Sequence, residues 1–269
     1  MDYLSPILER KRREIAARFR HRSQRSHRAP APAAVSGNLD RGQLAVEALR
    51  RQPGQLPAAI AEFKRSSPSA GVIRARQRGD VERIARQYVA AGARAVSVLC
   101  DGPGFRGSPL DVRRAALATP APVLFKEFVL DEIQIELARS MGAHMVLLVV
   151  RALPAARLHA LVEATCAAGM APVVEAADAA EVRVALATRA RIVGVNARDL
   201  RTFEVDVDAA GVALSAIPAD RVAVHMSGVR TRDDYVQLSR GRADAVLIGE
   251  GLMRAADPGQ RLRELLGTA

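Results

Sequence analysis

From residue 58 onward, short runs of β-branched and other apolar residues alternate with stretches in which apolar residues recur every three to four positions. The runs predict strands, and the stretches between them predict amphipathic helices. The eight runs lie at residues 59–64, 95–100, 123–128, 145–150, 171–176, 191–197, 222–227 and 243–249. Eight strands that are each followed by a helix predict an α/β fold of one kind, the closed parallel (β/α)8 or TIM barrel.

The residues that punctuate this pattern support the same architecture. Helix-start signals lie between the runs, at Asp80, Ser108-Pro109, Asp131, Thr231 with Asp234, and Asp257-Pro258. Helices are expected to end at Gly92, Gly142 and Gly169, each just before the next run. An open doubly wound sheet usually has fewer strands and a glycine-rich turn after the first one, which this chain lacks.

Residues 1–57 precede the predicted barrel, which takes up residues 58–269. Helical periodicity predicts an N-terminal helical extension with two helices, at residues 2–20 and 41–51. An Arg-rich and then Ala/Pro-rich linker joins them. We expect this extension to dock over one mouth of the barrel.

The formal net charge is +11, and part of it comes from residues 10–28, where basic side chains face only Glu9 and Glu14. Such a run binds nucleic acid or an anionic membrane in some proteins, and in others it is a solvated helix. We favour the solvated helix and expect no nucleic-acid partner, because base-reading aromatics and known binding motifs are missing around it. A basic protein also attracts anionic substrates.

Targeting signals and metal-ligand patterns are missing from the sequence. No apolar run approaches the roughly 18–20 residues needed to span a bilayer, and the N-terminus does not resemble a secretory signal. Cys100 and Cys166 form no disulfide framework, so we expect a cytoplasmic protein without a membrane partner. The five histidines have no metal-ligand spacing, and Cys100 has no predicted histidine neighbour, so neither a metal site nor a cysteine nucleophile is expected.

The scarcity of lysine directs attention to the lysines that are present. Of the 40 basic residues only three are lysine, namely Lys11, Lys64 and Lys126. A lysine can exchange a proton near neutral pH when its surroundings tune it, whereas a guanidinium stays charged. Lys64 and Lys126 stand near the carboxyl ends of two predicted strands, which is where the sites of such barrels lie.

Other polar residues accompany them at the same strand ends. Glu62 stands two positions before Lys64, so both side chains point the same way, and the fifth and sixth strands carry Glu175 and Asn196. A buried structural ion pair such as Glu62–Lys126 is the alternative interpretation, because buried charges are rare unless paired. Five polar groups at one mouth exceed what one pair requires, so we favour a catalytic site.

The loops after the last two strands have the composition of an anion site. They read Ser227-Gly228-Val229-Arg230 and Gly249-Glu250-Gly251. Barrels often hold phosphate there with backbone N–H groups, and glycine permits close approach of the backbone. The loop after the first strand, residues 66–71 with Ser67, can add hydroxyl donors to the same anion.

Several of these residues occur in motifs of one family. Residues 61–69, Ala-Glu-Phe-Lys-Arg-Ser-Ser-Pro-Ser, resemble the A-E-x-K-x-x-S-P-S signature of the indole-3-glycerol-phosphate synthase family. Supporting motifs are Phe105-Arg106-Gly107-Ser108, Leu124-Phe125-Lys126-Glu127-Phe128, Val174-Glu175, Val195-Asn196-Ala197-Arg198-Asp199-Leu200 and Ile248-Gly249-Glu250-Gly251-Leu252-Met253-Arg254. The similarity covers essentially the whole chain.

The resemblance implies a ribulose-phosphate-binding barrel that acts as a carboxy-lyase in tryptophan biosynthesis. Its substrate would be 1-(2-carboxyphenylamino)-1-deoxyribulose 5-phosphate, which closes an indole ring with loss of CO₂ and water and without a cofactor or metal. By position, Lys126 resembles the general acid of ring closure, and Glu175 and Lys64 resemble the acid–base groups of the later steps. Glu62 and Asn196 would orient the lysines and bind sugar hydroxyls.

The resemblance also implies a substrate-binding set. Its members are Ser67, Phe105, Arg198, Ser227, Gly228, Gly249 and Glu250. Within this set, Ser67, Gly228, Gly249 and the backbone N–H of Glu250 would hold the phosphate. The family includes monomers, and we expect a monomer or a weak homodimer.

Three positions depart from the family pattern. Met226 replaces the glutamate of the usual Glu-Ser-Gly, Glu127 replaces an aspartate, and Ala177 replaces a histidine. Strand parity predicts that Met226 points into the barrel and that His225 faces the helices. The loss of a carboxylate at Met226 keeps alternatives open: a specialised paralogue with a modified substrate, an isomerase of related phosphoribosyl compounds, or a non-catalytic barrel that binds a phosphorylated metabolite.

Overall fold

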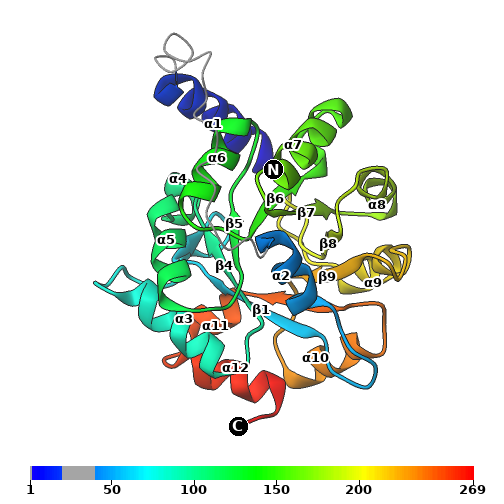
Figure 1. The fold of residues 1–269 in the computed structure, drawn as a ribbon. Helices are drawn as coiled ribbons and strands as arrows, with labels where there is room; N and C mark the ends of the chain where they lie inside the picture. Colours follow the sequence, from blue (N-terminus) through cyan, green and yellow to red (C-terminus); the bar gives the residue numbers. More distant parts are fainter. Residues whose placement is uncertain (1, 20–39) are drawn as a thin grey trace.

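The computed structural model describes residues 2–19 and 40–269, and the predicted (β/α)8 barrel is confirmed (Figure 1). The barrel strands are β1 (Ala58–Phe63), β4 (Ala95–Leu99), β5 (Val123–Lys126), β6 (Met145–Val149), β7 (Ala171–Ala176), β8 (Ile192–Asn196), β9 (Val222–Met226) and β10 (Ala245–Ile248). All neighbouring strands are parallel, and β1 pairs with both β4 and β10, which closes the sheet. Every predicted run overlaps one of these strands, and the ends differ by at most two residues.

Helices cover the outside of the barrel. They are α3 (Asp80–Ala90), α5 (Pro109–Ala118), α6 (Glu132–Ser140), α7 (Ala155–Ala167), α8 (Ala179–Leu186), α9 (Val207–Ser215), α10 (Arg232–Ser239) and α12 (Pro258–Leu266). Asp131 and Thr231 are the N-caps of α6 and α10, which confirms the predicted helix starts, and each forms a capping box. The start signal at Asp80 is wrong by one residue, because Gly79 is the N-cap and the Asp80 carboxylate binds Arg65 instead.

Shorter elements lie in the loops. They are the hairpin of β2 (Ser66–Ser67) and β3 (Gly71–Val72), the helices α4 (Gly102–Phe105) and α11 (Glu250–Arg254), and the 3₁₀ turn η1 (Val150–Ala152). The α4 segment and the two residues after it have the spacing G-x-G-x-x-G, but Asp101 caps α4 here and the segment follows β4. It is therefore part of a barrel loop and not a dinucleotide fingerprint.

Strand alternation divides the core into two parts. One buried cluster fills the barrel interior and includes Ile60, Leu124 and Val224, and the other lies between the sheet and the surrounding helices. Burial of each such side chain contributes about 1.5–3 kcal/mol to stability. Glu62 has the parity of Ile60 on β1, so its side chain points into the barrel. Polar residues at inward positions near the strand ends therefore meet at one mouth.

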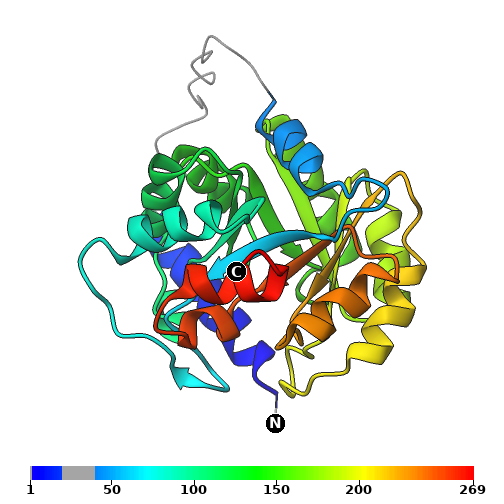
Figure 2. The ribbon, with the colours of Figure 1, turned by 90° about the horizontal axis from the view of Figure 1, so that it is seen from below.

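The two N-terminal helices lie at opposite ends of the barrel, which Figure 2 shows as blue elements on either side of the strands. α1 (Leu4–Phe19) packs at the carboxyl ends of the strands, where Tyr3 N–H donates to the Arg201 carbonyl over 3.1 Å. α2 (Arg41–Leu49) covers the other end, where Gly42 N–H donates to the Gly169 carbonyl over 3.1 Å. The expectation that both helices dock over one mouth is wrong, because each one closes a different end.

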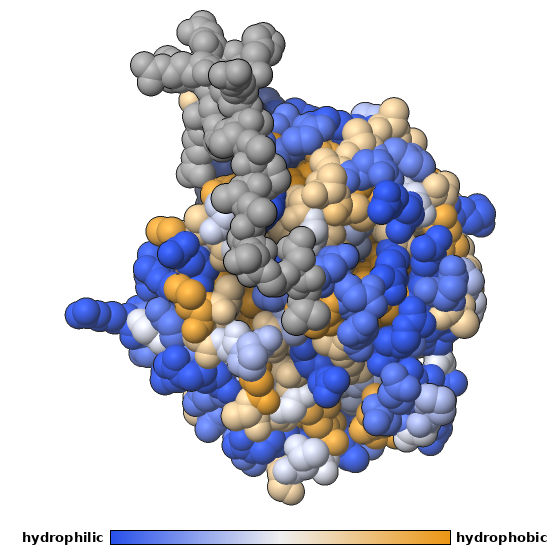
Figure 3. Space-filling model, in the orientation of Figure 1, coloured by the Kyte–Doolittle hydropathy of each residue, from blue (hydrophilic) through white to orange (hydrophobic). Residues whose placement is uncertain are grey.

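The prediction of a solvated basic helix is also wrong in part. Lys11 in α1 is only 5% exposed and contacts acidic side chains of the barrel. The predicted linker falls at residues that lie outside the described part of the chain. No helix in that part is long and apolar enough to cross a membrane. The face in Figure 3 is hydrophilic over much of its area, with apolar residues scattered between charged ones.

Candidate active site

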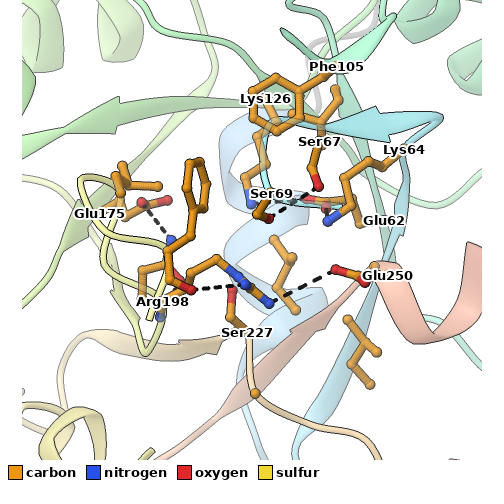
Figure 4. Close-up of a pocket in the computed structure, with 18 of the residues that line it drawn as sticks. Glu62, Lys64, Ser67, Ser69, Phe105, Lys126, Glu175, Arg198, Ser227 and Glu250 are labelled. Atoms are coloured by element: carbon orange, nitrogen blue, oxygen red, sulfur yellow. Dashed lines mark hydrogen bonds and ion pairs between the residues drawn. The ribbon is translucent and has the colours of Figure 1, made fainter. Parts of the chain in front are cut away.

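A cavity of about 350 Å³ opens at the carboxyl ends of the barrel strands (Figure 4). Its wall contains all twelve residues that the sequence singled out: Glu62, Lys64, Ser67, Phe105, Lys126, Glu175, Asn196, Arg198, Ser227, Gly228, Gly249 and Glu250. They come from β1, β5, β7 and β8 and from loops at the same end of the barrel. Segments that are far apart in the sequence thus bring these residues to one pocket.

Two lysines share one carboxylate in this cavity. Lys126 Nζ lies 2.9 Å from Glu62 Oε2, and Lys64 Nζ lies 3.2 Å from Glu62 Oε1. The ion pair Glu62–Lys126, which the sequence offered as the alternative to a catalytic site, is therefore present, and Lys64 joins it. Burial opposes the charge of Glu62, yet the two ammonium groups lower the pKa of its carboxyl below the ordinary value. Glu62 stays ionised and keeps both lysines oriented.

Glu175 lies on the other side of Lys126. Asn196 Nδ2 donates to Glu175 Oε1 over 3.0 Å, whereas Glu175 Oε2 is buried and has no hydrogen-bond partner within the described chain. Burial opposes the charge of Lys126, but Glu62 and Glu175 together raise the pKa of its ammonium. The ammonium of Lys126 is thus protonated at neutral pH, and an acceptor oxygen stands free opposite it.

Gly249 is required by the position of Glu62. A Cβ built on Gly249 would lie 2.5 Å from Glu62 Oε1 and 3.1 Å from Glu62 Cβ. Any larger residue here would push the shared carboxylate away from the lysines. The glycine that the sequence assigned to an anion loop therefore also makes room for the charged groups.

The backbone at the end of β9 adopts an unusual conformation. Ser227 and Gly228 both have positive φ angles, of 70° and 87°. His225 Nε2 donates to the Ser227 carbonyl over 2.9 Å, and burial lowers the pKa of the imidazole, which keeps the ring neutral. The side chain of His225 points away from the barrel interior, as strand parity predicted. Its hydrogen bond holds the Ser227 turn from the outer side of the sheet.

Met226 points into the barrel, as parity predicted, and is completely buried with Val224. A Cβ on Gly194 would collide with the Met226 side chain, so Met226 fills the space that Gly194 leaves on the neighbouring strand. Met226 is not among the residues that line the cavity. It contributes apolar packing beneath the polar pocket.

Sequence reasoning missed the apolar wall of the cavity. This wall includes Leu99, Phe128, Leu147, Val149, Leu200, Phe203, Val205 and Leu247. The rings of Phe105 and Phe128 lie 6.5 Å apart. Strand alternation could have predicted Leu147 and Leu247, but Phe203 belongs to a loop and is placed by a ring contact with Tyr3 of the N-terminal segment. Among residues 2–19 and 40–269, no cluster of His, Cys, Asp and Glu has the arrangement of a metal site.

The barrel and the pocket together define a class of protein: an enzyme of the (β/α)8-barrel type whose site combines paired lysines, a free glutamate oxygen and an apolar wall. The family model described as "Indole-3-glycerol phosphate synthase" matches residues 4–265. The chain belongs to the indole-3-glycerol phosphate synthase family, which is a family of carboxy-lyases of tryptophan biosynthesis. The resemblance seen in the sequence motifs is thereby confirmed.

Individual relatives agree with this assignment. The chain is 40% identical over 268 residues to an indole-3-glycerol phosphate synthase of Albidiferax ferrireducens, a match that covers 100% of this chain and 99% of that protein. It is 46% identical over 217 residues to indole-3-glycerol phosphate synthase 2 of Streptomyces coelicolor, which covers 81% and 83% of the two chains.

Similar solved structures support the fold alone. A 3-hexulose-6-phosphate synthase superposes with a TM-score of 0.63 at 15% identity, covering 78% of this chain and 99% of that one. A mutant tryptophan synthase alpha-subunit from Pyrococcus furiosus gives a TM-score of 0.60 at 16% identity, covering 78% and 98%.

Proposed function

We propose that the chain converts 1-(2-carboxyphenylamino)-1-deoxyribulose 5-phosphate to indole-3-glycerol phosphate, CO₂ and water. The observation that carries this proposal is the shared carboxylate of Glu62, which holds Lys64 and Lys126 as two cations in one cavity. Opposite them Glu175 keeps an oxygen without a partner within the described chain. Ring closure requires a proton donor, and dehydration requires a proton donor and a proton acceptor; this site offers both kinds of group.

In the first step, the ring carbon that bears the carboxylate attacks the ketone carbon of the sugar chain, and a carbon–carbon bond forms. Lys126 donates a proton to the ketone oxygen, where negative charge develops. Its position between Glu62 and Glu175 supports this role, because their negative charges keep the ammonium protonated until the substrate accepts the proton.

In the later steps, the carboxylate leaves as CO₂ and its bonding electrons restore the aromatic ring. The hydroxyl formed in the first step then leaves as water after it receives a proton, and a proton is removed from the neighbouring carbon to form the double bond. Glu175 and Lys64 are the groups we assign to these two proton movements. The unpartnered Glu175 Oε2 supports a role as the acceptor.

The two ends of the cavity suit the two ends of the substrate. Ser67, Gly228, Gly249 and the Glu250 N–H form the proposed phosphate site, and Arg198 bridges toward Glu250 with its Nη2 4.0 Å from Glu250 Oε2. The aromatic ring of the substrate would pack against the apolar wall around Phe105. We therefore expect the reacting carbons of the substrate to lie near Glu62, between these two ends of the cavity.

We propose the same chain division as the sequence suggested, with residues 1–57 as a helical extension and 58–269 as the catalytic barrel. The contacts of α1 and α2 at opposite ends support an extension that is part of the barrel's packing. A cytoplasmic monomer or weak homodimer without a nucleic-acid partner belongs to this proposal. The ion pair of Arg10 with Asp101 at 2.8 Å supports the expectation that nucleic acid is not a partner, because it engages basic charge of the N-terminal helix within the protein.

Turnover of the carboxyphenylamino-deoxyribulose phosphate, followed by indole absorbance, tests the proposed function. We expect turnover by the wild type, because Met226 lies beneath the cavity and leaves its charged groups in place. Met226→Glu is expected to lower the melting temperature without raising kcat, because the new carboxylate would be buried against Gly194. A folded wild type without turnover would contradict the proposal and favour a modified substrate.

Gly249→Ala tests the importance of the shared carboxylate. The added Cβ displaces Glu62 from Lys64, so we expect kcat/KM to fall by about tenfold or more. The matched control is Gly211→Ala in α9, where a Cβ would meet no atom within 4 Å and turnover should stay at the wild-type value. Equal turnover of the two variants would show that the position of Glu62 is unimportant.

A further inference from the structure

The N-terminal segment with α1 contacts two separate sides of the cavity mouth. Near its start, the ring of Tyr3 packs edge-on against Phe203, with ring centroids 4.7 Å apart. About two helical turns later, Lys11 reaches acidic residues of the loops after β4 and β5. Phe203 and both acidic residues line the cavity. This segment therefore connects parts of the cavity wall that are distant in the sequence.

Lys11 is the centre of a buried charge cluster. Its Nζ lies 2.9 Å from Glu14 Oε2, 3.0 Å from Asp101 Oδ1 and 3.1 Å from Glu127 Oε2. Asp101 is completely buried and Glu127 is 7% exposed. Arg10 is a second cation that contacts Asp101. Because buried carboxylates need a counter-charge, the positions of Asp101 and Glu127 depend on the ammonium of Lys11.

Asp101 links the cluster to one wall of the cavity. Its Oδ2 accepts the N–H of Gly104 over 2.8 Å, and its carbonyl accepts the N–H of Gly107 over 2.9 Å. These bonds shape α4, which ends at the cavity residue Phe105. A displacement of Asp101 would therefore move the ring of Phe105.

Glu127 links the cluster to the reacting groups. It follows Lys126 directly in the chain, and its Oε1 accepts the N–H of Phe128 over 2.8 Å. Lys126 and Phe128 both line the cavity. The side chain of Glu127 therefore anchors the stretch of backbone from which the proposed general acid projects.

We propose that Lys11 is a positioning residue of the active site. Through Asp101 and Glu127 it sets the placement of Phe105 and of Lys126 from a helix that lies outside the barrel. This inference rests on the proposed function, because Lys126 and Phe105 have their roles in that reaction. It assigns to α1 a task in catalysis in addition to packing.

The cluster also makes the site sensitive to pH. Burial raises the pKa of Glu127 to about 7, with Asp101 adding to the rise and Lys11 opposing it. The other groups that face this region are the buried thiol of Cys100 and, beyond Lys11 and Asp101, the side chains of Glu14 and Arg10. Below pH 7 Glu127 becomes neutral and its ion pair with Lys11 is lost, so we expect turnover to fall.

The contribution of Glu127 to folding stability changes with pH in the direction opposite to turnover. Because the pKa of Glu127 is higher in the folded chain than in the unfolded one, its contribution to stability is complete below about pH 4.5 and is lost as the pH rises through about 7. Acid therefore strengthens folding through Glu127 while it weakens the contact with Lys11. A loss of turnover near pH 6 that accompanies unchanged or higher stability would separate positioning from simple unfolding.

The test compares kcat, KM and melting temperature for Lys11→Met, Lys11→Arg and Glu127→Gln in the full chain. We expect Lys11→Met to lower kcat and raise KM, with kcat/KM reduced by roughly tenfold to a hundredfold, and Lys11→Arg to restore most of the loss. Arg13→Met is the matched control, since Arg13 lies on the same helix, is 74% exposed and pairs only with exposed Glu9 among the described residues. It should leave kcat and KM unchanged.

Glu127→Gln provides the second variant in case Lys11→Met does not fold. It should lower kcat and remove the ionisation near pH 7 from the profile of kcat/KM, and the effect of Lys11→Met should be smaller in its background. An active wild type whose Glu127→Gln variant keeps wild-type kcat, KM and pH profile would overturn this inference alone. A wild type without turnover would instead overturn the proposed function.

Discussion

Replacement of Lys126 by methionine is expected to lower kcat by about a thousandfold or more while the protein remains folded. The variant loses the proton donor of ring closure and the positive charge beside the developing oxyanion, and each of these effects alone is worth about a hundredfold or more. Glu62 keeps its contact with Lys64, so its buried carboxylate still has a counter-charge in the variant. Steady-state turnover together with a melting curve measures both parts of the prediction.

Lys126→Arg separates the charge from the proton. Arginine keeps the positive charge next to Glu62 and Glu175, but its guanidinium does not release a proton near neutral pH. If Lys126 is the general acid, the arginine variant should be nearly as inactive as the methionine variant. Recovery of most of the turnover by arginine would show that Lys126 acts as a fixed charge and that another group donates the proton.

Replacement of Arg65 by methionine is expected to cost the largest amount of stability, about 3–5 kcal/mol. The guanidinium is 2% exposed and binds two buried carboxylates, Asp80 at 2.9 and 3.1 Å and Asp111 at 2.6 Å. Its Cζ also lies 4.6 Å from the ring centre of Phe63. Asp111 keeps a contact with Arg114 in the variant, whereas Asp80 keeps only backbone donors among the described residues.

This loss should shift the melting temperature down by roughly 10 °C for a chain of this size. The control is Arg189→Met, which breaks the exposed pair of Arg189 with Glu163 and should cost less than about 1 kcal/mol. Equal melting temperatures for the two variants would mean that the buried network adds no stability.

The pH dependence of the unfolding free energy identifies the source of the stability loss in Arg65→Met. Burial opposes the charge of Asp80, but the hydrogen bonds from Arg65 lower the pKa of this carboxyl below its value in the unfolded chain. Its contribution to stability is therefore present above about pH 3.8 and disappears as the pH falls through the lower folded-state pKa. The difference in unfolding free energy between the wild type and Arg65→Met should narrow on acidification.

Turnover should also decrease in Arg65→Met, because the ion pairs of the Arg65 side chain hold the backbone of this residue in place. The carbonyl of Arg65 accepts the N–H groups of Ile73 and Arg74, and these bonds close the loop that carries Ser67. Ser67 lies in the proposed phosphate site, so a loosened loop is expected to raise KM more than it lowers kcat.

The sequence by itself determined the barrel and which polar residues lie together at one of its mouths. Strand and helix periods are local properties, and eight repeats of the unit leave few other topologies. Because strand alternation and strand ends follow from the same periods, the sequence alone suffices to place Glu62, Lys64, Lys126, Glu175 and Asn196 at one mouth of the barrel. The inward side chain of Met226 follows in the same way.

Only the tertiary structure decided how these groups are paired. Whether Glu62 binds one lysine or two depends on distances across the closed barrel, and the space for its carboxylate depends on Gly249, which follows the last strand. The burial of Lys11 depends on Asp101 and Glu127, which lie roughly 90 and 116 residues further along the chain. Local periodicity contains no information on such contacts, because they arise when the barrel closes and the N-terminal helix packs over one of its mouths.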